Sequence, residues 1–174
     1  VVDNNDRIVI GSSIPKYTYG ITLGGSFIGI DLDLFFQGVA DVQTYANGNL
    51  AFPYRNGAGV TKEWLTDSWT PENPGASLPI LTTSSGYPQN YLTSDFWIKD
   101  ASYLRLKNIQ LAYTLPAAWL QQLHLRKLKV FVNAQNYLTI TKFKLGDPER
   151  NLTRANMIDY PNYKSITAGA NLTL

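Results

Sequence analysis

Few residues in this chain have the types and spacing that covalent chemistry requires. The sequence contains no cysteine, which excludes thiol catalysis, disulfide bonds and cysteine-based metal sites. The one histidine, His124, stands between two leucines, with no nucleophile or carboxylate at a catalytic spacing. We therefore expect His124 to be a surface or packing residue, and we predict no catalytic residue, no metal site and no cofactor.

Two pairs of carboxylates are the remaining candidates for chemistry. Asp147 and Glu149 flank a proline in the motif D-P-E-R; glycosidases use two carboxylates, but a proline in this context is typical of a turn. Asp31 and Asp33 alternate along a predicted strand, and no glycine-spaced Ca²⁺-ligand loop accompanies them. In a wide barrel these two aspartates would line a wet lumen, and in a β-sandwich they would face solvent.

The elements that position these side chains are predicted by apolar and polar residues that alternate with a period of two. On this pattern we expect strands over about 17–27, 30–40, 96–115, 127–140 and 163–174. The first two are separated only by Ile28 and Gly29, which predicts a tight hairpin. The phase of the third changes near Lys107 and Asn108, which predicts a β-bulge.

The final strand is apolar on one side and carries small or polar residues on the other. The terminal residues of a soluble protein usually fray. A transmembrane β-barrel, in contrast, pairs its last strand with its first, because every backbone group in lipid must be hydrogen-bonded. The alternating pattern covers about nine residues, near the ~9–11 that a tilted strand needs to cross a bilayer. An ordinary half-buried strand of a soluble sheet is the alternative interpretation.

The composition also favours a membrane barrel. Charged residues make up 16% of the chain, below the ~25% of typical soluble domains, whereas aromatic residues make up 13%. No run of about 18 apolar residues is present, so no transmembrane helix is expected. The net charge of +2 is too small to indicate a nucleic-acid partner. In the predicted barrel, the lipid-facing residues would be Ile21, Leu23, Leu32, Leu34, Ile166, Ala168, Ala170, Leu172 and Leu174.

Two long irregular segments connect the predicted strands, at about 41–94 and 141–162. Only residues 61–65 within the first segment have a helical pattern, and compact soluble domains rarely contain an irregular segment as long as this one. Counting strands places both segments at one end of the sheet and both short connections, 28–29 and 116–126, at the other. Outer-membrane barrels follow this arrangement, with long extracellular loops and short periplasmic turns.

Aromatic residues near the strand ends are candidates for two kinds of contact. Trp64, Trp69, Tyr87 and Tyr91 lie in the first long segment. Aromatic faces stack on sugar rings or peptide side chains, so we take these four as candidate substrate-binding residues. The alternative is that they pack the loop against itself or against a partner. Trp119, in the second short connection, would sit at the periplasmic lipid interface.

Several motifs resemble the SusC/RagA family of TonB-linked outer-membrane transporters. They are S-D-F-W-I-K-D-A-S-Y-L-R-L-K-N-I-Q-L-A-Y-T-L-P (94–116), L-R-K-L-K-V-F-V-N-A-Q-N-Y-L-T-I-T-K-F (125–143) followed by G-D-P-E, then Tyr160-Pro161 and a final strand of the type G-x-N-L-T. Residues 17–38 resemble the preceding hairpin of the same family. The resemblance covers most of the chain except 41–94. Leu174 stands where these proteins usually end in an aromatic residue.

The resemblance implies an all-β fold: an antiparallel up-and-down transmembrane β-barrel. This chain would be its C-terminal segment, with about five strands of a roughly 22-stranded, plugged barrel. It further implies a place in the bacterial outer membrane and TonB-dependent import of oligosaccharides or peptides, without enzymatic activity. The expected partners are a SusD-like surface lipoprotein, the TonB complex through an N-terminal part absent here, the remainder of the barrel and the lipid bilayer.

The chain begins V-V-D-N-N-D without a visible signal peptide, which favours a fragment of a larger protein.

Two other functions stay open at this point. Few charges and many aromatic residues also fit a secreted β-sandwich that binds glycans. A structural porin without active transport is the third candidate.

Overall fold

The computed structural model describes residues 8–83, 85–121, 125–150 and 160–173. The chain divides into two compact units. The strand unit comprises Lys16–Ala40, Ser102–Thr141 and Asn162–Leu174. The loop unit comprises Val1–Pro15, Asp41–Ala101 and Lys142–Pro161.

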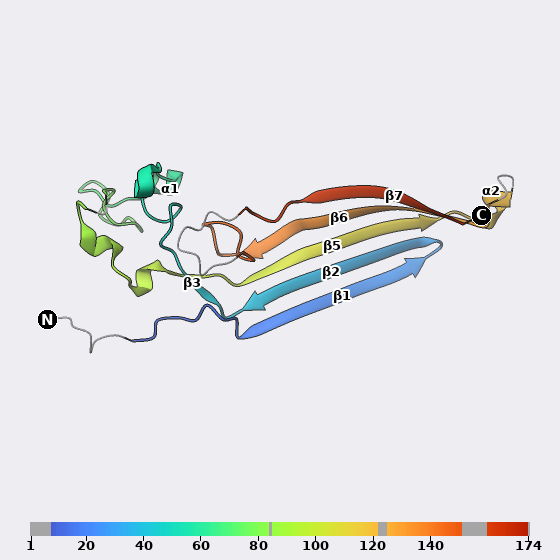
Figure 1. Cartoon of the computed structure of the whole chain (residues 1–174), viewed down its shortest axis with the longest axis horizontal. Coiled ribbons are helices and arrows are strands. Elements are labelled where there is room, and N and C mark those ends of the chain that lie inside the picture. Colours follow the sequence, from blue (N-terminus) through green and yellow to red (C-terminus); the bar gives the residue numbers. More distant parts are fainter. Residues whose placement is uncertain (1–7, 84, 122–124, 151–159, 174) are drawn as a thin grey trace. The chain divides into compact units, whose positions relative to one another are not determined.

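The strand unit is a single antiparallel sheet whose strands lie side by side in chain order (Figure 1). Its strands are β1 (Tyr17–Phe27), β2 (Ile30–Ala40), β5 (Tyr103–Thr114), β6 (Lys127–Thr141) and β7 (Ser165–Thr173). Each strand pairs with its neighbours in the chain order, so the connections run up and down without a crossover. This arrangement confirms the predicted all-β, antiparallel up-and-down barrel segment.

Both short connections lie at the same end of this sheet. Ile28 and Gly29 have φ values of 47° and 79°, and two positive φ values in succession are the signature of a type I′ hairpin turn. The backbone N–H of Thr114 donates to the carbonyl of Gly29 at 2.7 Å, which anchors the turn to β5. The turn at Ile28 and Gly29 confirms the predicted hairpin. The short helix α2 (Ala117–Leu120) begins the second short connection, from β5 to β6.

A bulge interrupts the sheet at its centre. The register shifts between Phe35 and Phe36 on β2 and between Leu106 and Asn108 on β5. Opposite this point on β6, Asn136 has a φ of 54°, a left-handed conformation that asparagine tolerates. The bulge confirms the predicted phase change, and it keeps Leu106 and Ile109 on one face of the sheet.

The predicted strand over 96–115 begins too early. Residues Asp95–Trp97 form the 3-10 helix η4, and Ile98–Asp100 form the short strand β4, which pairs with β3 (Gln43–Tyr45) in the loop unit. The strand β5 starts only at Tyr103. The cause is tertiary: Trp97 is 2% exposed in the core of the loop unit, and its packing there ends the sheet strand.

The loop unit has a hydrophobic core of its own. Its buried residues are Ala46, Ala51, Phe52, Trp64 and Trp97. Its helical elements are η2 (Arg55–Gly57), α1 (Lys62–Thr66), η3 (Pro88–Tyr91) and η4. The helix α1 confirms the helical pattern over 61–65. Most of the segment is irregular, as predicted, but the aromatic cluster orders it.

Candidate functional site

One face of the strand unit is apolar across all five strands. Directly paired residues of antiparallel strands project on the same side of a sheet. One such row runs Leu23, Leu34, Ile109, Ala134 and Ile166, from β1 to β7. Every residue in this row is apolar, so the alternation read from each strand becomes one continuous surface.

This apolar face is exposed within the strand unit. Leu23, Leu111 and Leu172 are each 53–54% exposed. Large aliphatic side chains on the packed face of a soluble sheet are buried instead. The residues predicted to contact lipid all lie on this face as far as the structure describes them: Ile21, Leu23, Leu32, Leu34, Ile166, Ala168, Ala170 and Leu172. Leu174 lies outside the described residues. Lipid contact by the individual residues stays a prediction.

Aromatic side chains mark both ends of the apolar face. On β1, Tyr19 and Phe27 lie on this face near opposite ends of the strand. They are separated by about 27 Å at ~3.4 Å per residue, which is about 21 Å along the membrane normal for a strand tilted by ~40°. This height is close to the ~25 Å apolar band of outer-membrane barrels. Trp119, in α2, is 63% exposed, and its place at the periplasmic interface stays a prediction.

The opposite face of the sheet is polar. One row runs Gly24, Asp33, Gln110, Asn133 and Thr167, without a single apolar side chain. The side-chain amide of Asn133 donates to Asn108 at 2.6 Å, so neighbouring strands are also joined by side chains on this face. A sheet with one apolar and one polar face fits a barrel wall between lipid and a wet lumen.

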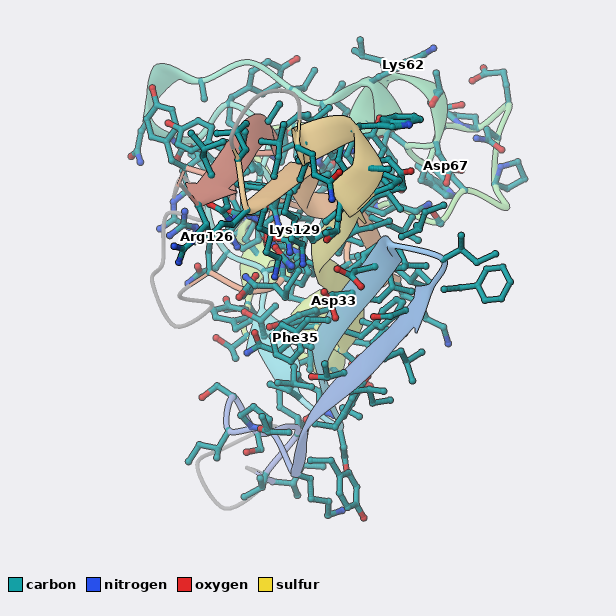
Figure 2. The ribbon with its side chains drawn as sticks, turned by 90° about the vertical axis from the view of Figure 1, so that its right-hand side faces the viewer. Asp33, Phe35, Lys62, Asp67, Arg126 and Lys129 are labelled. Atoms are coloured by element: carbon teal, nitrogen blue, oxygen red, sulfur yellow. The ribbon has the colours of Figure 1, made fainter. Side chains whose placement is uncertain are left out.

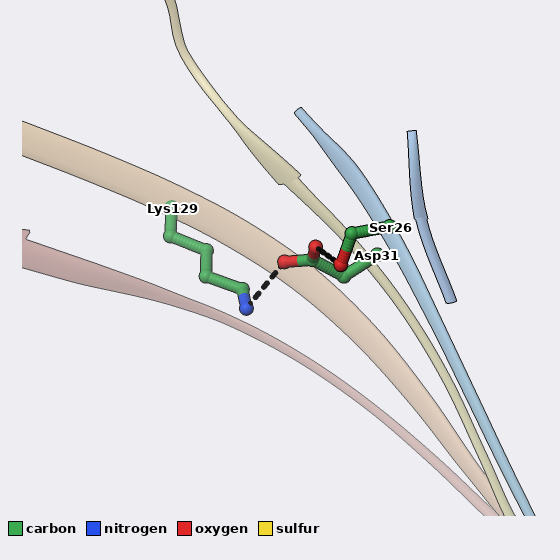
Figure 3. A network of polar contacts seen from close by, with 3 residues as sticks. All are labelled: Ser26, Asp31 and Lys129. Carbon is green, nitrogen blue, oxygen red and sulfur yellow. Dashed lines mark hydrogen bonds and ion pairs between the residues drawn. The ribbon is translucent and has the colours of Figure 1, made fainter. Parts of the chain in front are cut away.

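An ion pair near the short-turn end crosses this polar face. The ammonium group of Lys129 on β6 lies 2.7 Å from the carboxylate of Asp31 on β2, with β5 between the two strands (Figure 3). The hydroxyl of Ser26 donates to the same carboxylate at 2.5 Å. Asp33 and Phe35 lie on this face as well (Figure 2). Asp31 therefore joins β1, β2 and β6 through side-chain contacts on the polar face.

A tyrosine ties three strands together on the apolar face. The hydroxyl of Tyr19 on β1 donates to the carbonyl of Tyr103 on β5 at 3.1 Å, and the ring passes over β2 at Gly38. A Cβ atom at Gly38 would lie 2.3 Å from the Tyr103 carbonyl oxygen and 2.6 Å from the Tyr19 hydroxyl. Only glycine leaves room for this crossing.

Of the four candidate substrate-binding aromatics of the loop unit, Trp64 and Tyr91 pack in the same aromatic core, whereas Trp69 and Tyr87 are not part of it. Trp64 is 3% exposed, and its Nε1–H donates to the carbonyl of Ala51 at 2.9 Å, so its ring serves packing. Tyr91 is half-buried; burial raises the pKa of its phenol, which donates to the Thr82 carbonyl at 2.7 Å. Trp69 and Tyr87 are 41% and 52% exposed. These two keep free surface for a ligand.

The residues considered for covalent chemistry form turns or lie outside the described part. The backbone N–H of Glu149 donates to the Asp147 carboxylate at 3.0 Å, and the N–H of Arg150 donates to the Asp147 carbonyl, which makes D-P-E-R a turn. His124 lies outside the described residues. Among the residues that the structure describes, no three His, Asp or Glu side chains gather as metal ligands.

A cavity in the loop unit was not predicted from the sequence. It has a volume of ≈ 260 Å³, and five separate stretches of the chain line it. They lie within 50–51, 61–64, 77–78, 96–100 and 142–145. Because these stretches come from both long loops, no local motif or spacing could have indicated the cavity. We call this feature the loop cavity.

Comparisons with known proteins agree with this architecture. No family model matches the chain. The TonB-dependent receptor P26 of Formosa agariphila is 30% identical over 99% of this chain, and TonB-dependent receptor SusC of Bacteroides thetaiotaomicron is 29% identical over 85% of it. The RagAB peptide importer in its closed-closed state matches with a TM-score of 0.73 and 28% identity over 95% of this chain.

These relatives are much longer than the chain. It spans 18% of receptor P26, 15% of SusC and 18% of the matched RagAB chain. None of the helices that the structure describes is long and apolar enough to cross a membrane. The two-faced sheet, the short connections at one end and the match to these receptors over nearly the whole of this chain have one explanation. The chain belongs to the SusC/RagA family of TonB-dependent receptors of the bacterial outer membrane, as a segment of the barrel wall with its loops.

Proposed function

We propose that the protein to which this segment belongs imports oligosaccharides or peptides across the outer membrane with energy supplied through TonB. In this function the strand unit seals the barrel against lipid and lines its lumen, and the loop unit forms part of the extracellular vestibule. No bond of the cargo is made or broken, so the protein is not an enzyme. The observation that carries the proposal is the sheet with one apolar face and one mostly polar face.

We propose that the loop unit contacts the cargo and does more than connect the strands. Its aromatic core holds a defined surface, on which Trp69 and Tyr87 are exposed. Exposed aromatic faces stack on sugar rings or peptide side chains. We therefore propose Trp69 and Tyr87 as cargo contacts, and Trp64 and Tyr91 as residues that hold the vestibule in shape.

The partners follow from the same proposal. A SusD-like surface lipoprotein would cover the extracellular mouth, and the TonB complex would act through parts of the protein outside this chain. Copurification of the full-length transporter from outer membranes tests the first partner: a surface lipoprotein should remain bound in mild detergent. Recovery of the transporter without any lipoprotein would contradict this part of the proposal.

Uptake by intact cells tests the central function. Cells that express the full-length transporter should accumulate labelled peptides or oligosaccharides, and deletion of TonB should abolish this accumulation. Undiminished uptake without TonB would instead indicate a passive porin. Parallel cultures on peptides and on oligosaccharides separate the two classes of cargo.

A secreted β-sandwich remains testable by solubility. A sandwich covers the apolar face of each sheet with a second sheet, whereas the strand unit has one layer. Extraction should require detergent, because Leu23, Leu32 and Leu172 would otherwise face water. Recovery of a stable full-length protein in buffer alone would refute the membrane assignment.

A further inference from the structure

The loop cavity combines an apolar floor with a charged rim. Phe96, Trp97 and Leu78 contribute apolar surface, and Phe143 closes the floor at 5% exposure. The charged lining residues are Lys99, Lys142, Lys144, Glu63 and Asp100. Ammonium groups thus outnumber carboxylates by three to two. A cavity of this kind favours a ligand with an apolar body and a negative group.

Two of the three lysines are free to bind an anion. Lys142 and Lys144 are exposed and flank the buried Phe143. Neither makes a hydrogen bond or an ion pair with any residue that the structure describes. The third, Lys99, lies over the Phe96 ring, with its ammonium 4.8 Å from the ring centroid. Unpaired ammonium groups beside an apolar surface gain most from a ligand carboxylate.

The aromatic residues of the cavity do not suit a sugar ring. Stacking on a sugar needs an open aromatic face, and Trp64 and Trp97 are only 3% and 2% exposed, which leaves Phe96, at 38% exposure, as the one well-exposed aromatic ring among the lining residues. Lys99 lies over the Phe96 ring. The volume of ≈ 260 Å³ is also below the ~300–1,000 Å³ of pockets that hold whole ligands. One residue of an oligomer fits this space better than a complete molecule.

We propose that the loop cavity binds the C-terminal residue of a peptide, with the apolar side chain against Phe96 and Leu78 and the terminal carboxylate beside Lys142 and Lys144. This inference rests on the proposed import function and adds a cargo subsite to the extracellular vestibule. It selects peptides over oligosaccharides as the cargo class. A carboxylate that meets two ammonium groups in a partly apolar cavity forms charge-assisted contacts, which are stronger than contacts between neutral groups.

Calorimetry on the full-length transporter in detergent tests the subsite. The probes are N-acetyl-Ala-Ala-Phe with a free C-terminal carboxylate and the same peptide as its C-terminal amide. Wild type should bind the acid about tenfold more tightly than the amide. The double substitution K142A/K144A should remove this preference without changing the affinity for the amide, which also reports intact folding.

The matched control is K62A. Lys62 is an exposed lysine on α1 (Figure 2). It is not among the residues that line the cavity, so its loss should leave the preference for the acid unchanged. Equal binding of acid and amide by wild type, absence of binding of both probes, or the same loss in K62A as in K142A/K144A would each overturn the subsite. TonB-dependent uptake without any preference for the acid would overturn the subsite and leave the import function standing. Uptake that is independent of TonB would overturn the import function itself.

Discussion

The crossing of Tyr19 over Gly38 predicts a large effect from the smallest possible substitution. In Gly38→Ala the new methyl group would lie 2.3 Å from the Tyr103 carbonyl oxygen, which belongs to the backbone of β5 and cannot move alone. Strands β2 and β5 must therefore separate, and overpacking of this kind costs about 1–3 kcal/mol. The methyl group also displaces the Tyr19 hydroxyl and breaks its 3.1 Å hydrogen bond, at a cost of about 1 kcal/mol.

One opposing effect must be subtracted. Alanine in place of glycine restricts the unfolded chain and stabilises a protein by about 0.4–1 kcal/mol when the site is compatible. The net destabilisation by Gly38→Ala is then about 1–3 kcal/mol. The matched control is Gly25→Ala on β1, which lies on the same face and has no atom within 4 Å of the added methyl group. We expect this control to be neutral or slightly stabilising.

Gel mobility of the full-length transporter after heating in SDS provides the assay. Folded barrels resist SDS and migrate differently from the unfolded chain, so the fraction folded can be followed against temperature. Gly38→Ala should lower the midpoint, and Gly25→Ala should not. Gly38→Ala should lower the midpoint less when it is introduced into the Y19A variant than when it is introduced into wild type, because the clash with the Tyr19 side chain is then absent. Equal midpoints for Gly38→Ala and Gly25→Ala would refute this account of the strand packing.

Three further substitutions test other features. Ile28→Asn should stabilise the β1–β2 hairpin by up to about 1 kcal/mol, because Ile28 has a φ of 47° and Asn-Gly is the preferred type I′ pair; an unchanged or lower midpoint in the same gel assay would contradict this. Trp97→Ala should destabilise the loop unit by about 3–5 kcal/mol, so that trypsin added to intact cells cleaves the loop while the barrel stays SDS-resistant. In the loop unit, the hydroxyl and backbone N–H of Ser77 donate to Asp67 and hold the pKa of that carboxyl below its usual 3.8. A carboxyl whose pKa is lower in the folded state than in the unfolded state stabilises the fold at pH values above the unfolded-state pKa. Asp67→Asn should therefore weaken the loop unit's resistance to heat at neutral pH. The difference from wild type should vanish as the pH falls through about 4 and below, where the Asp67 carboxyl becomes protonated.

The strands could be predicted from the sequence because each one alternates by itself. The parity of Ile21 and Leu23 on β1, and of Ile166 and Leu172 on β7, is visible without any partner strand. The tight turn at Ile28 and Gly29 fixes the first register, and the bulge near Asn108 shows as a change of phase. The apolar face follows from such local information.

The loop unit could not be predicted in the same way. Trp97 continues the apparent strand pattern, yet it is withdrawn into a core with Phe52 and Trp64, which lie far away in the sequence. Nothing near Trp64 distinguishes a buried packing residue from the exposed Trp69, because their difference depends on contacts made by distant segments. The loop cavity is likewise formed by stretches that lie far apart in the sequence, so no single motif indicates it.

The shared core of the loop unit has a consequence for how such a receptor diversifies. Leu145 of the second long loop packs against the aromatic cluster of the first, so the two loops share one core. The two loops should therefore be exchanged together between receptors of this family if their common core is to be kept. Recombinants that inherit only one of the two would lose the fit between them.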